Sequence, residues 1–415
     1  MKKQLFSLLA LMLIFGAAVT AQIKITTIAG LQAMENDKSY ILDADIDLST
    51  LSVGLDKDLT NVIFDGNYHT LSNLIADGNA RGGLFKNISG STIKNLKINA
   101  FTVAGVWAGV IAGHADNSTI IRCSSVGTDV QSSGIAGGLI GHMEKTTISE
   151  CVVKGLISGH DHVGGIVGHM QNASKVENCY ADAVVVTDGW QVGGIVGWSE
   201  GINDIINNCY GAGTVSAAVG FTGGIIGAGV GGGVTVSNCL AIQTKLKANS
   251  DIPKTNRIVG DNGATTLVHN YGFVDMTWED PKRTETWTSL PAGKDGLSVT
   301  LALVANAQFY SDSLPTWDFN NVWIMDTNRP KLRMETSNTT SVNAPSVLQS
   351  IKILKNNGLI EINCPLNSTI TICDVMGRTL VQRKVKSNSE LFALKGLLVI
   401  KVDTSEGRGT YKILN

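Results

Sequence analysis

The sequence predicts an all-β protein: a parallel β-helix with about 28–30 amino acids per coil, followed by a small antiparallel β-sandwich. Two repeats predict the β-helix. Cysteines at positions 123, 151, 179, 209 and 239 follow one another at spacings of 28, 28, 30 and 30, and a glycine motif precedes each of them. The short β-branched runs between the glycines indicate strands, because they show no apolar period of about 3.6 residues.

The spacing of the repeat assigns side chains to columns. Successive coils of a β-helix stack about 4.8 Å apart, so residues at equivalent positions become vertical neighbours. We expect the five cysteines to form one interior column of reduced thiols, since a thiol packs as a small apolar group. Disulfides between neighbouring coils are the alternative that the expected Cα spacing permits. A second interior column is expected three residues before each cysteine, from Ile120, Ile148, Val176, Ile206 and Val236. In the preceding coil, Ile93 takes the place in this column and Leu96 takes the place in the cysteine column.

The residue before each cysteine is polar. Asn178, Asn208 and Asn238 stand at this corner in three coils, and we expect their amides to bond along a ladder of their own kind. Arg122 and Glu150 replace asparagine in two adjacent coils. We predict that these two pair across the coils, in a surface contact worth about 0–1 kcal/mol.

The glycine motifs and the segments after them resemble a known family. The motifs are Gly109–Gly113, Gly137–Gly141, Gly164–Gly168, Gly193–Gly197 and Gly223–Gly227, with an imperfect copy at Arg81–Phe85. Followed by ISECVVKGLIS or VENCYADAVVV, they resemble the GLUG repeats of bacterial surface proteins. Residues 40–49 and 62–74 resemble the coils that lead into such repeats, and residues 314–332 resemble the segment that ends them. The resemblance covers roughly residues 25–335 and implies a scaffold rather than a chemistry.

The N-terminal residues predict export. Lys2, Lys3, the apolar run Leu5–Phe15 and the small residues Val19–Ala21 are typical of a signal peptide. No later stretch has the roughly 20 apolar residues of a membrane span. We therefore expect an extracellular or outer-surface location. The predicted divisions are a signal peptide at 1–21, an N-terminal cap and opening coils at 22–80, GLUG-type repeats at 81–249, a C-terminal cap at 250–335, a linker at 336–347 and a β-sandwich at 348–415.

The predicted β-sandwich resembles the C-terminal sorting domain of the type IX secretion system of Bacteroidetes. Residues 370–381, 394–402 and the final TYKIL carry this resemblance. Leu398 stands where that family often has tyrosine, and the usual Tyr-Pro-Asn-Pro opening is missing, so recognition and cleavage of this tail do not follow. Cys364 and Cys373 are expected on neighbouring strands, either as a disulfide or as buried free thiols.

No catalytic residue, cofactor site or metal site is predicted. The formal net charge of −2 disfavours nucleic acid as a partner. His114, His142 and His169 share one column, which Trp198 continues; stacked imidazoles could bind a metal, but we favour a surface ladder at a turn. His160, Asp161 and His162 form the densest group of ligand-type side chains. The Asp and Glu residues of the coils occupy different positions within the repeat and form no common column. We interpret them as ordinary surface residues rather than as the carboxylate pair of a glycosidase.

Aromatic residues suggest the best candidate contact surface. Tyr180 and Tyr210 directly follow the cysteine column and should stack outward, while Trp190 and Trp198 lie near the glycine turns. Exposed aromatics can receive sugars or a protein partner, and packing against turns is the alternative. The favoured function is a secreted or cell-surface interaction protein, such as an adhesin, with a host protein or glycan as partner. The alternatives are a polysaccharide-binding or polysaccharide-degrading protein and a structural stalk without a ligand.

Overall fold

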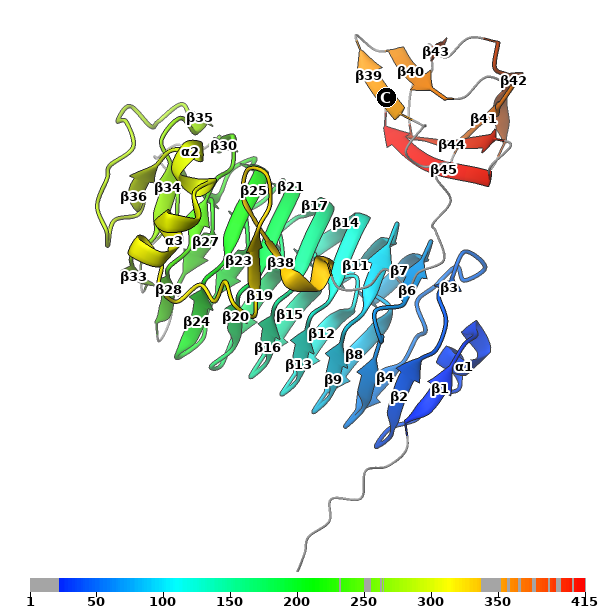
Figure 1. Cartoon of the computed structure of the whole chain (residues 1–415), viewed down its shortest axis with the longest axis horizontal. Helices are drawn as coiled ribbons and strands as arrows, with labels where there is room; N and C mark the ends of the chain where they lie inside the picture. Colours follow the sequence, from blue (N-terminus) through cyan, green and yellow to red (C-terminus); the bar gives the residue numbers. More distant parts are fainter. Residues whose placement is uncertain are drawn as a thin grey trace, which may run out of the picture. The chain divides into compact units, whose positions relative to one another are not determined.

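The chain forms two units, residues 1–337 and 338–415, which are described separately. The computed structural model (Figure 1) describes residues 22–336 except 231, 232, 250–254, 262 and 264, and in the second unit 352–356, 359–364, 367–374, 378–386, 389–392, 397–404 and 407–414. The predicted signal peptide and nearly all of the predicted linker lie outside the described residues.

The first unit is a parallel β-solenoid of about 9 turns, and small antiparallel sheets follow at the C-terminus, which confirms the predicted fold class. Most coils contribute strands to three sheets, here named A, B and C, and equivalent strands of successive coils pair in parallel (Figure 1). Backbone hydrogen bonds therefore run from coil to coil, along the axis of the solenoid.

Sheet A holds one short strand per coil. Its order is β1 (Ile23–Ile25), β2 (Ser39–Leu42), β5 (Ile63–Asp65), β9 (Thr92–Lys94), β13 (Thr119–Ile121), β16 (Thr147–Ser149), β20 (Lys175–Glu177), β24 (Asp204–Asn207), β28 (Val234–Ser237) and β33 (Thr265–Val268). Sheet C is ordered β4 (Asp58–Thr60), β8 (Phe85–Ser89), β12 (Ala112–Asp116), β15 (Ile140–Glu144), β19 (Val167–Gln171), β23 (Val196–Ser199), β27 (Ile226–Gly229) and β32 (Val259–Asp261).

Sheet B is the largest sheet, and most coils cross it with a longer strand or a pair of strands. It contains β3 (Ile46–Asp47), β6 (Thr70–Ser72), β7 (Ile75–Gly82), β10 (Lys97–Asn99), β11 (Thr102–Ala108), β14 (Ser124–Gly137), β17 (Val152–Gly159), β18 (His162–Gly164), β21 (Tyr180–Thr187), β22 (Gln191–Gly193), β25 (Tyr210–Ala217), β26 (Phe221–Gly223), β29 (Leu240–Ala241), β30 (Lys245–Lys247), β31 (Thr255–Asn256), β34 (Tyr271–Phe273), β35 (Thr277–Glu279) and β36 (Leu297–Val299).

The glycine motif forms the tight turn between sheet B and sheet C. At Gly137, a Cβ atom would lie 1.9 Å from the carbonyl oxygen of Ile140, so no larger residue fits there. At Gly141, a Cβ would lie 2.8 Å from the carbonyl oxygen of Gly113 in the preceding coil. The motif recurs because each coil must make this turn against its neighbour.

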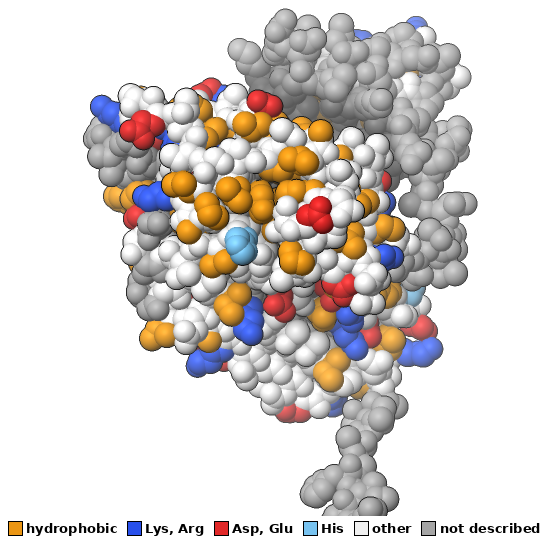
Figure 2. Space-filling model, turned by 60° about the vertical axis from the view of Figure 1, so that its left-hand side comes forward, with side chains coloured by type: hydrophobic (Ala, Val, Ile, Leu, Met, Phe, Trp, Pro, Cys, Tyr) orange, Lys and Arg blue, Asp and Glu red, His pale blue; other side chains and the backbone are white. Residues whose placement is uncertain are grey.

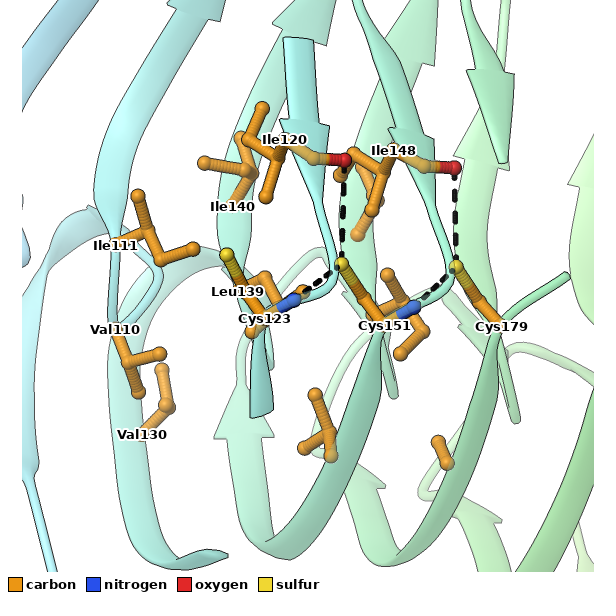
Figure 3. Packing of buried hydrophobic residues seen from close by; sticks show 14 of the residues in the cluster. Val110, Ile111, Ile120, Cys123, Val130, Leu139, Ile140, Ile148, Cys151 and Cys179 are labelled. Carbon is orange, nitrogen blue, oxygen red and sulfur yellow. Dashed lines mark hydrogen bonds between the residues drawn. The ribbon is translucent and has the colours of Figure 1, made fainter. Parts of the chain in front are cut away.

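The two predicted interior columns are present. Ile120 pairs in register with Ile93 and with Ile148, and the five cysteines are fully buried and free. Figure 3 shows Cys123, Cys151 and Cys179 beside Ile120 and Ile148. The backbone N–H of Cys123 donates to Sγ of Cys151 at 3.3 Å, and the N–H of Cys151 donates to Sγ of Cys179 at 3.4 Å. Burial raises the pKa of the Cys123, Cys179 and Cys239 thiols, which keeps them protonated and unreactive.

The polar corner before each cysteine has a backbone reason that the sequence analysis missed. Asn178, Asn208 and Asn238 have φ values of 52°, 53° and 54°, and Arg122 and Glu150 have φ values of 54° and 52°. Asparagine tolerates this left-handed region better than most residues. Asn208 Nδ2 donates to Asn178 Oδ1 at 3.3 Å as expected for an amide ladder, but Asn238 Nδ2 donates to Asn207 Oδ1 at 3.0 Å instead of continuing it. Arg122 Nη1 lies 3.9 Å from Glu150 Oε1, as predicted.

A buried ladder of hydroxyl groups lines another corner and was not predicted. Each hydroxyl accepts a hydrogen bond from the backbone N–H of the residue one coil earlier, at 3.0–3.2 Å. The ladder is formed by Ser91, Ser118, Thr146 and Ser174, and the carboxylate of Asp204 ends it by accepting from Ser174 N–H at 2.9 Å. These side chains satisfy donors at a corner where the sheets leave them unpaired.

The solenoid continues beyond the cysteines in both directions. Tyr40 and Phe64 extend the isoleucine column before Ile93. In the coil after Cys239, His269 occupies the corner position, with a φ value of 49°. Asn270 occupies the interior position of the cysteines, and its Oδ1 accepts a hydrogen bond from the backbone N–H of Cys239 at 3.0 Å. Coils therefore extend into the region 250–335, which the sequence analysis assigned to the C-terminal cap.

A buried arginine organises the last coils. Arg257 is fully buried, and its guanidinium donates to backbone carbonyls of Gly272, Phe273, Thr288, Asp295 and Gly296 and to Ser298 Oγ. Burial lowers its pKa to about 10, so it remains charged at neutral pH. Next to it, Arg283 pairs with Asp295 at 3.0 Å.

The end of the solenoid after the last coil is apolar on its surface. Figure 2 brings this end forward, and hydrophobic side chains gather there. Val268, Leu301 and Leu303 are among the exposed apolar residues of this region.

The remaining elements of the first unit are short. They are α1 (Ile28–Gln32), α2 (Leu301–Val304), α3 (Ala307–Ser313), the antiparallel pair β37 (Trp323–Met325) and β38 (Pro330–Leu332), and the 3₁₀ helix η1 (Arg333–Glu335). α2 to η1 belong to a segment, residues 299–335, that returns along the solenoid and is called the strap below.

The second unit has two antiparallel sheets. One is ordered β39 (Lys352–Asn356), β40 (Leu359–Asn363) and β43 (Ser389–Phe392), and the other β42 (Thr379–Lys384), β41 (Thr369–Asp374), β44 (Leu397–Thr404) and β45 (Gly407–Leu414). Its core includes Ile360, Ile370, Ile372 and Ile400. Cys364 and Cys373 are buried free thiols, not a disulfide.

Candidate functional site

The predicted tyrosine surface is not exposed. Tyr180 and Tyr210 stack outward from sheet B as expected, with ring centroids 4.5 Å apart and an interplanar angle of 7°. They are nevertheless only 2% and 1% exposed, because Trp317 and Trp323 of the strap cover them. The expectation of an open aromatic face was wrong here: these rings form a second hydrophobic core.

The strap is held by polar contacts as well as by packing. Tyr210 Oη donates to the Pro330 carbonyl at 2.8 Å, and Tyr180 Oη donates to Glu335 at 2.7 Å. Lys154 pairs with Glu335 at 3.0 Å. Corner asparagines also take part, since Asn208 accepts from Thr316 Oγ1 at 2.7 Å and Trp323 Nε1 reaches Asn178 Oδ1 at 3.4 Å. The strap thus closes this part of sheet B to ligands.

The histidine column is present but lies inside the protein. His114, His142 and His169 follow one another in register on sheet C, and Trp198 comes next. His142 and His169 are 7% and 8% exposed and lie within strands, so the expected surface ladder at a turn was wrong. A facing column from sheet B covers them, in which Trp107 lies 4.9 Å from His142 between ring centroids, and His162 lies 4.2 Å from Trp198.

This double column keeps its imidazoles neutral. Burial, together with a smaller effect of the neighbouring histidines, lowers the pKa of His142 to about 4 and the pKa of His169 to about 3. Burial also lowers the pKa of His114 and His162. Trp198, predicted to contact a ligand, stacks on His169 at 4.6 Å and belongs to this packed column.

Acid should therefore weaken the fold through the double column. Unfolded histidines titrate near 6.5, whereas His142 and His169 titrate far lower in the folded state, so the unfolded state binds more protons between these values. The free energy of unfolding should fall as pH drops from about 6.5 towards 4, by up to about 1.4 kcal/mol per pH unit for each histidine. Urea unfolding of the full chain at several pH values measures this slope, and His142→Gln should make it shallower.

His160 offers a matched control for this pH dependence. It is exposed, and its hydrogen bond to Asp188 raises its pKa, so any stability that it adds is lost as pH rises. His160→Gln should leave the acid slope unchanged. An equal slope in wild type and His142→Gln would show that the buried column does not cause the acid sensitivity.

The adjacent His160, Asp161 and His162 do not converge. His160 Nδ1 lies 2.6 Å from Asp188 Oδ1 on the surface, whereas His162 points into the double column. Among the described residues, no group of three or more His, Cys, Asp or Glu side chains is placed to hold a metal ion.

Two acids of the coils do share a column, contrary to the sequence analysis. Asp116 and Glu144 are in register on adjacent strands of sheet C, and Gln171 takes the same place in the next coil. Glu144 accepts from Asn172 Nδ2 at 3.0 Å, and Asp116 Oδ2 accepts from Ser89 Oγ at 3.4 Å. Both carboxylates thus have local partners beside the histidine column.

An open groove on sheet B is the strongest candidate site. It has a volume of about 990 Å³ and crosses five coils, from β7 through β11, β14 and β17 to β21. This volume is typical of sites for small or chain-like ligands. Four coil steps give it a length of about 19 Å along the axis. Its lining is Ala80, Ala104, Gly105, Val106, Gln131, Ser132, Ser133, Ser158, Gly159, His160, Val186 and Asp188.

The lining of this axial groove combines small apolar and hydrogen-bonding side chains. Gln131, Ser158 and Val186 are in register on β14, β17 and β21, so each coil presents one side chain to the groove at this position. His160 and Asp188 form an acid–base pair at 2.6 Å, with exposed fractions of 56% and 77% for their side chains. The groove therefore offers a repeated polar surface with one titratable pair.

Trp190 stands beside the groove, and of the four predicted contact residues only this one is exposed, at 54%. It lies two residues after the lining residue Asp188, in a corner one residue longer than the corresponding corner of the preceding coil. The sequence signal for this site was the change in cysteine spacing from 28 to 30, since one of the two extra residues lies in this corner. The groove itself was missed, because its side chains have no repeated identity.

Comparisons with known proteins agree with this architecture. Residues 159–187 match the family model described as the GLUG motif. A segment of 119 residues is 29% identical to a protein named immunoglobulin A1 protease from Streptococcus pneumoniae; it covers 26% of this chain but 6% of that protein. Among the described residues, no helix has the length and apolar character needed to cross a bilayer.

A solved structure shares the fold. The crystal structure described as "a putative immunoglobulin A1 protease from Bacteroides ovatus" aligns with a TM-score of 0.53 and 17% identity, over 75% of this chain and 92% of that one. The chain therefore carries a GLUG motif on a β-helix scaffold, the fold that it shares with that crystal structure.

Proposed function

We propose that this chain is a ligand-binding β-helix of an exported surface protein, and that its axial groove holds the ligand without catalysing a reaction on it. The groove is the observation that carries the proposal: a hollow of about 990 Å³ across five coils, on the part of sheet B that the strap leaves open. The predicted leader at 1–21, the GLUG match and the sorting-domain resemblance of residues 370–381 support an extracellular setting.

Binding fits the groove better than hydrolysis does. Glycoside hydrolysis by a β-helix enzyme uses at least two carboxyl groups that face the scissile bond from opposite sides. Among its lining residues the groove has one carboxylate, Asp188, and His160 already engages it. The hydroxyl and amide groups of Ser132, Ser158 and Gln131 suit recognition instead.

The proposal is tested by binding of the full chain to an array of immobilised polysaccharides and extracellular-matrix proteins. We expect retention on at least one surface without release of fragments. Ser158→Trp, which fills the middle of the groove, should abolish retention. Ile202→Ala changes an exposed apolar side chain at another corner and should leave it intact.

Three results would contradict the proposal. Retention that Ser158→Trp does not reduce would place the ligand elsewhere on the molecule. Release of fragments from a retained polymer, lost in His160→Gln, would make the groove an active site. No retention on any surface would favour a structural stalk.

A further inference from the structure

We infer that the ligand of the axial groove is an uncharged glycan chain lying along the solenoid axis. This inference rests on the proposed function and adds the chemical class and the direction of the ligand. Four features of the groove support it: its periodicity, its hydrogen-bonding groups, its charge and the exposed indole at one end.

The periodicity of the groove fits a sugar chain better than a polypeptide. Coils repeat about every 4.8 Å along the groove, a rise close to the length of one pyranose unit in an extended glycan. Side chains on one side of an extended polypeptide recur about every 6.7 Å, which is out of step with the coils. A glycan can thus place one sugar unit over each of the coils of Gln131, Ser158 and Val186, whereas the side chains of an extended peptide fall out of step with the coils.

The hydrogen-bonding groups also disfavour a peptide. The backbone groups of β14, β17 and β21 are used in the ladders between coils, so the groove presents side chains rather than an open strand edge. An extended peptide would find no backbone partners for its own obligatory N–H and C=O groups. Sugar hydroxyls can donate as well as accept. In the groove, Ser132 Oγ and Ser158 Oγ donate to the carbonyls of Val106 and Val130 at 2.7 and 3.1 Å, and Gln131 Nε2 donates to Asp129 at 3.0 Å. The remaining lone pairs of these hydroxyls and the Gln131 amide oxygen are therefore the groups that accept from a sugar hydroxyl.

The charge of the groove disfavours an anionic chain. The described lining contains no lysine or arginine, which are the side chains that bind carboxylates and sulfates. The His160–Asp188 pair has no net charge when the imidazole is protonated and one negative charge when it is not. Asp129, which accepts from Gln131 at 3.0 Å, and Asp161, next to His160, add further negative charge. An uncharged glycan meets no repulsion here.

Trp190 follows Asp188 by two residues, at the corner after β21 where the groove ends, and its exposed indole offers an apolar ring face at this corner. The C–H groups of a pyranose pack on such a face, while its hydroxyls bond to neighbouring polar side chains. One aromatic platform beside a row of hydroxyl groups is the arrangement that an uncharged sugar chain requires.

Calorimetric titration of the full chain tests the inference. The probes are cellohexaose, mannohexaose and laminarihexaose as uncharged chains, with hexagalacturonate as the charged counterpart. At least one uncharged chain should bind, and hexagalacturonate should bind at least about ten-fold more weakly. Affinity for the bound chain should rise from the disaccharide to the tetrasaccharide and then level off, because the groove spans about four coil steps.

Two variants locate the binding. Trp190→Ala should lower the affinity for the hexasaccharide that binds wild type by about ten-fold or more. Ile202→Ala, a similarly exposed apolar residue at another corner of the chain, should leave affinity unchanged. Circular dichroism of both variants checks that the solenoid remains folded.

The outcomes separate this inference from the proposed function. If only a protein or an anionic glycan binds, and Ser158→Trp abolishes that binding, the groove remains the site and the ligand class is wrong. If an uncharged chain binds equally to wild type, Trp190→Ala and Ser158→Trp, both proposals fail. If no probe of any class binds, both fail as well.

Discussion

Replacing Arg257 by alanine should open the last coils of the solenoid. The buried guanidinium donates to five backbone carbonyls and to Ser298 Oγ, and alanine would leave these acceptors without partners. Loss of these buried hydrogen bonds should lower the free energy of unfolding of the last coils by about 3–5 kcal/mol. Because each coil contacts only its neighbours, the loss should remain local.

Hydrogen exchange of the full chain measures this effect. Amides of residues 240–299 should lose protection by about a hundred-fold or more, while those of 93–151 keep it. Lys294→Ala removes an exposed cation from the same cap and serves as the control. Unchanged protection in Arg257→Ala would show that packing of the cap, not the arginine, holds the coils.

Replacing Trp323 by alanine should release the strap. This indole is fully buried, stacks on Trp317 with 4.5 Å between ring centroids, and covers Tyr180 and Tyr210. Truncation of a buried tryptophan costs about 3–5 kcal/mol. Trp317 also lies near Tyr210, at 6.3 Å between ring centroids, but Trp323 lies near both tyrosines, so its loss should uncover Tyr180 and loosen the strap over Tyr210.

Limited proteolysis within residues 314–335 reports on the strap. Cleavage of Trp323→Ala should be at least about a hundred-fold faster than that of wild type. Trp190→Ala changes an exposed residue of the same type and should be cleaved like wild type. Trp323→Phe should recover most of the resistance, and equal resistance of Trp323→Ala and wild type would mean that polar contacts suffice to hold the strap.

The interior of the solenoid could be predicted from the sequence because a fixed spacing becomes a vertical column. Cys123, Cys151 and Cys179 repeat in identity, and the same step places Ile120 over Ile148. The corner residues were identified too, although the reason for asparagine there is its positive φ rather than its amide alone.

The surface could not be predicted in the same way. Tyr180 and Tyr210 do project outward, but the segment that covers them lies more than a hundred residues later and has no repeat. Burial of His142 depends likewise on Trp107, which comes from a different strand and a different coil. Outward positions depend on what packs over them, and spacing alone carries no information about that.

The strap also fixes how many coils can lie between the points where it is anchored to the solenoid. Its contacts run from Trp317 at Asn238 back to Glu335 at Lys154, so they join coils that are several steps apart. A duplicated or deleted coil within this interval would move one anchor by about 4.8 Å against the other and break the match. Growth or shortening of the solenoid by whole repeats is compatible with the strap only towards the N-terminal side of Lys154, the side on which most of the axial groove lies.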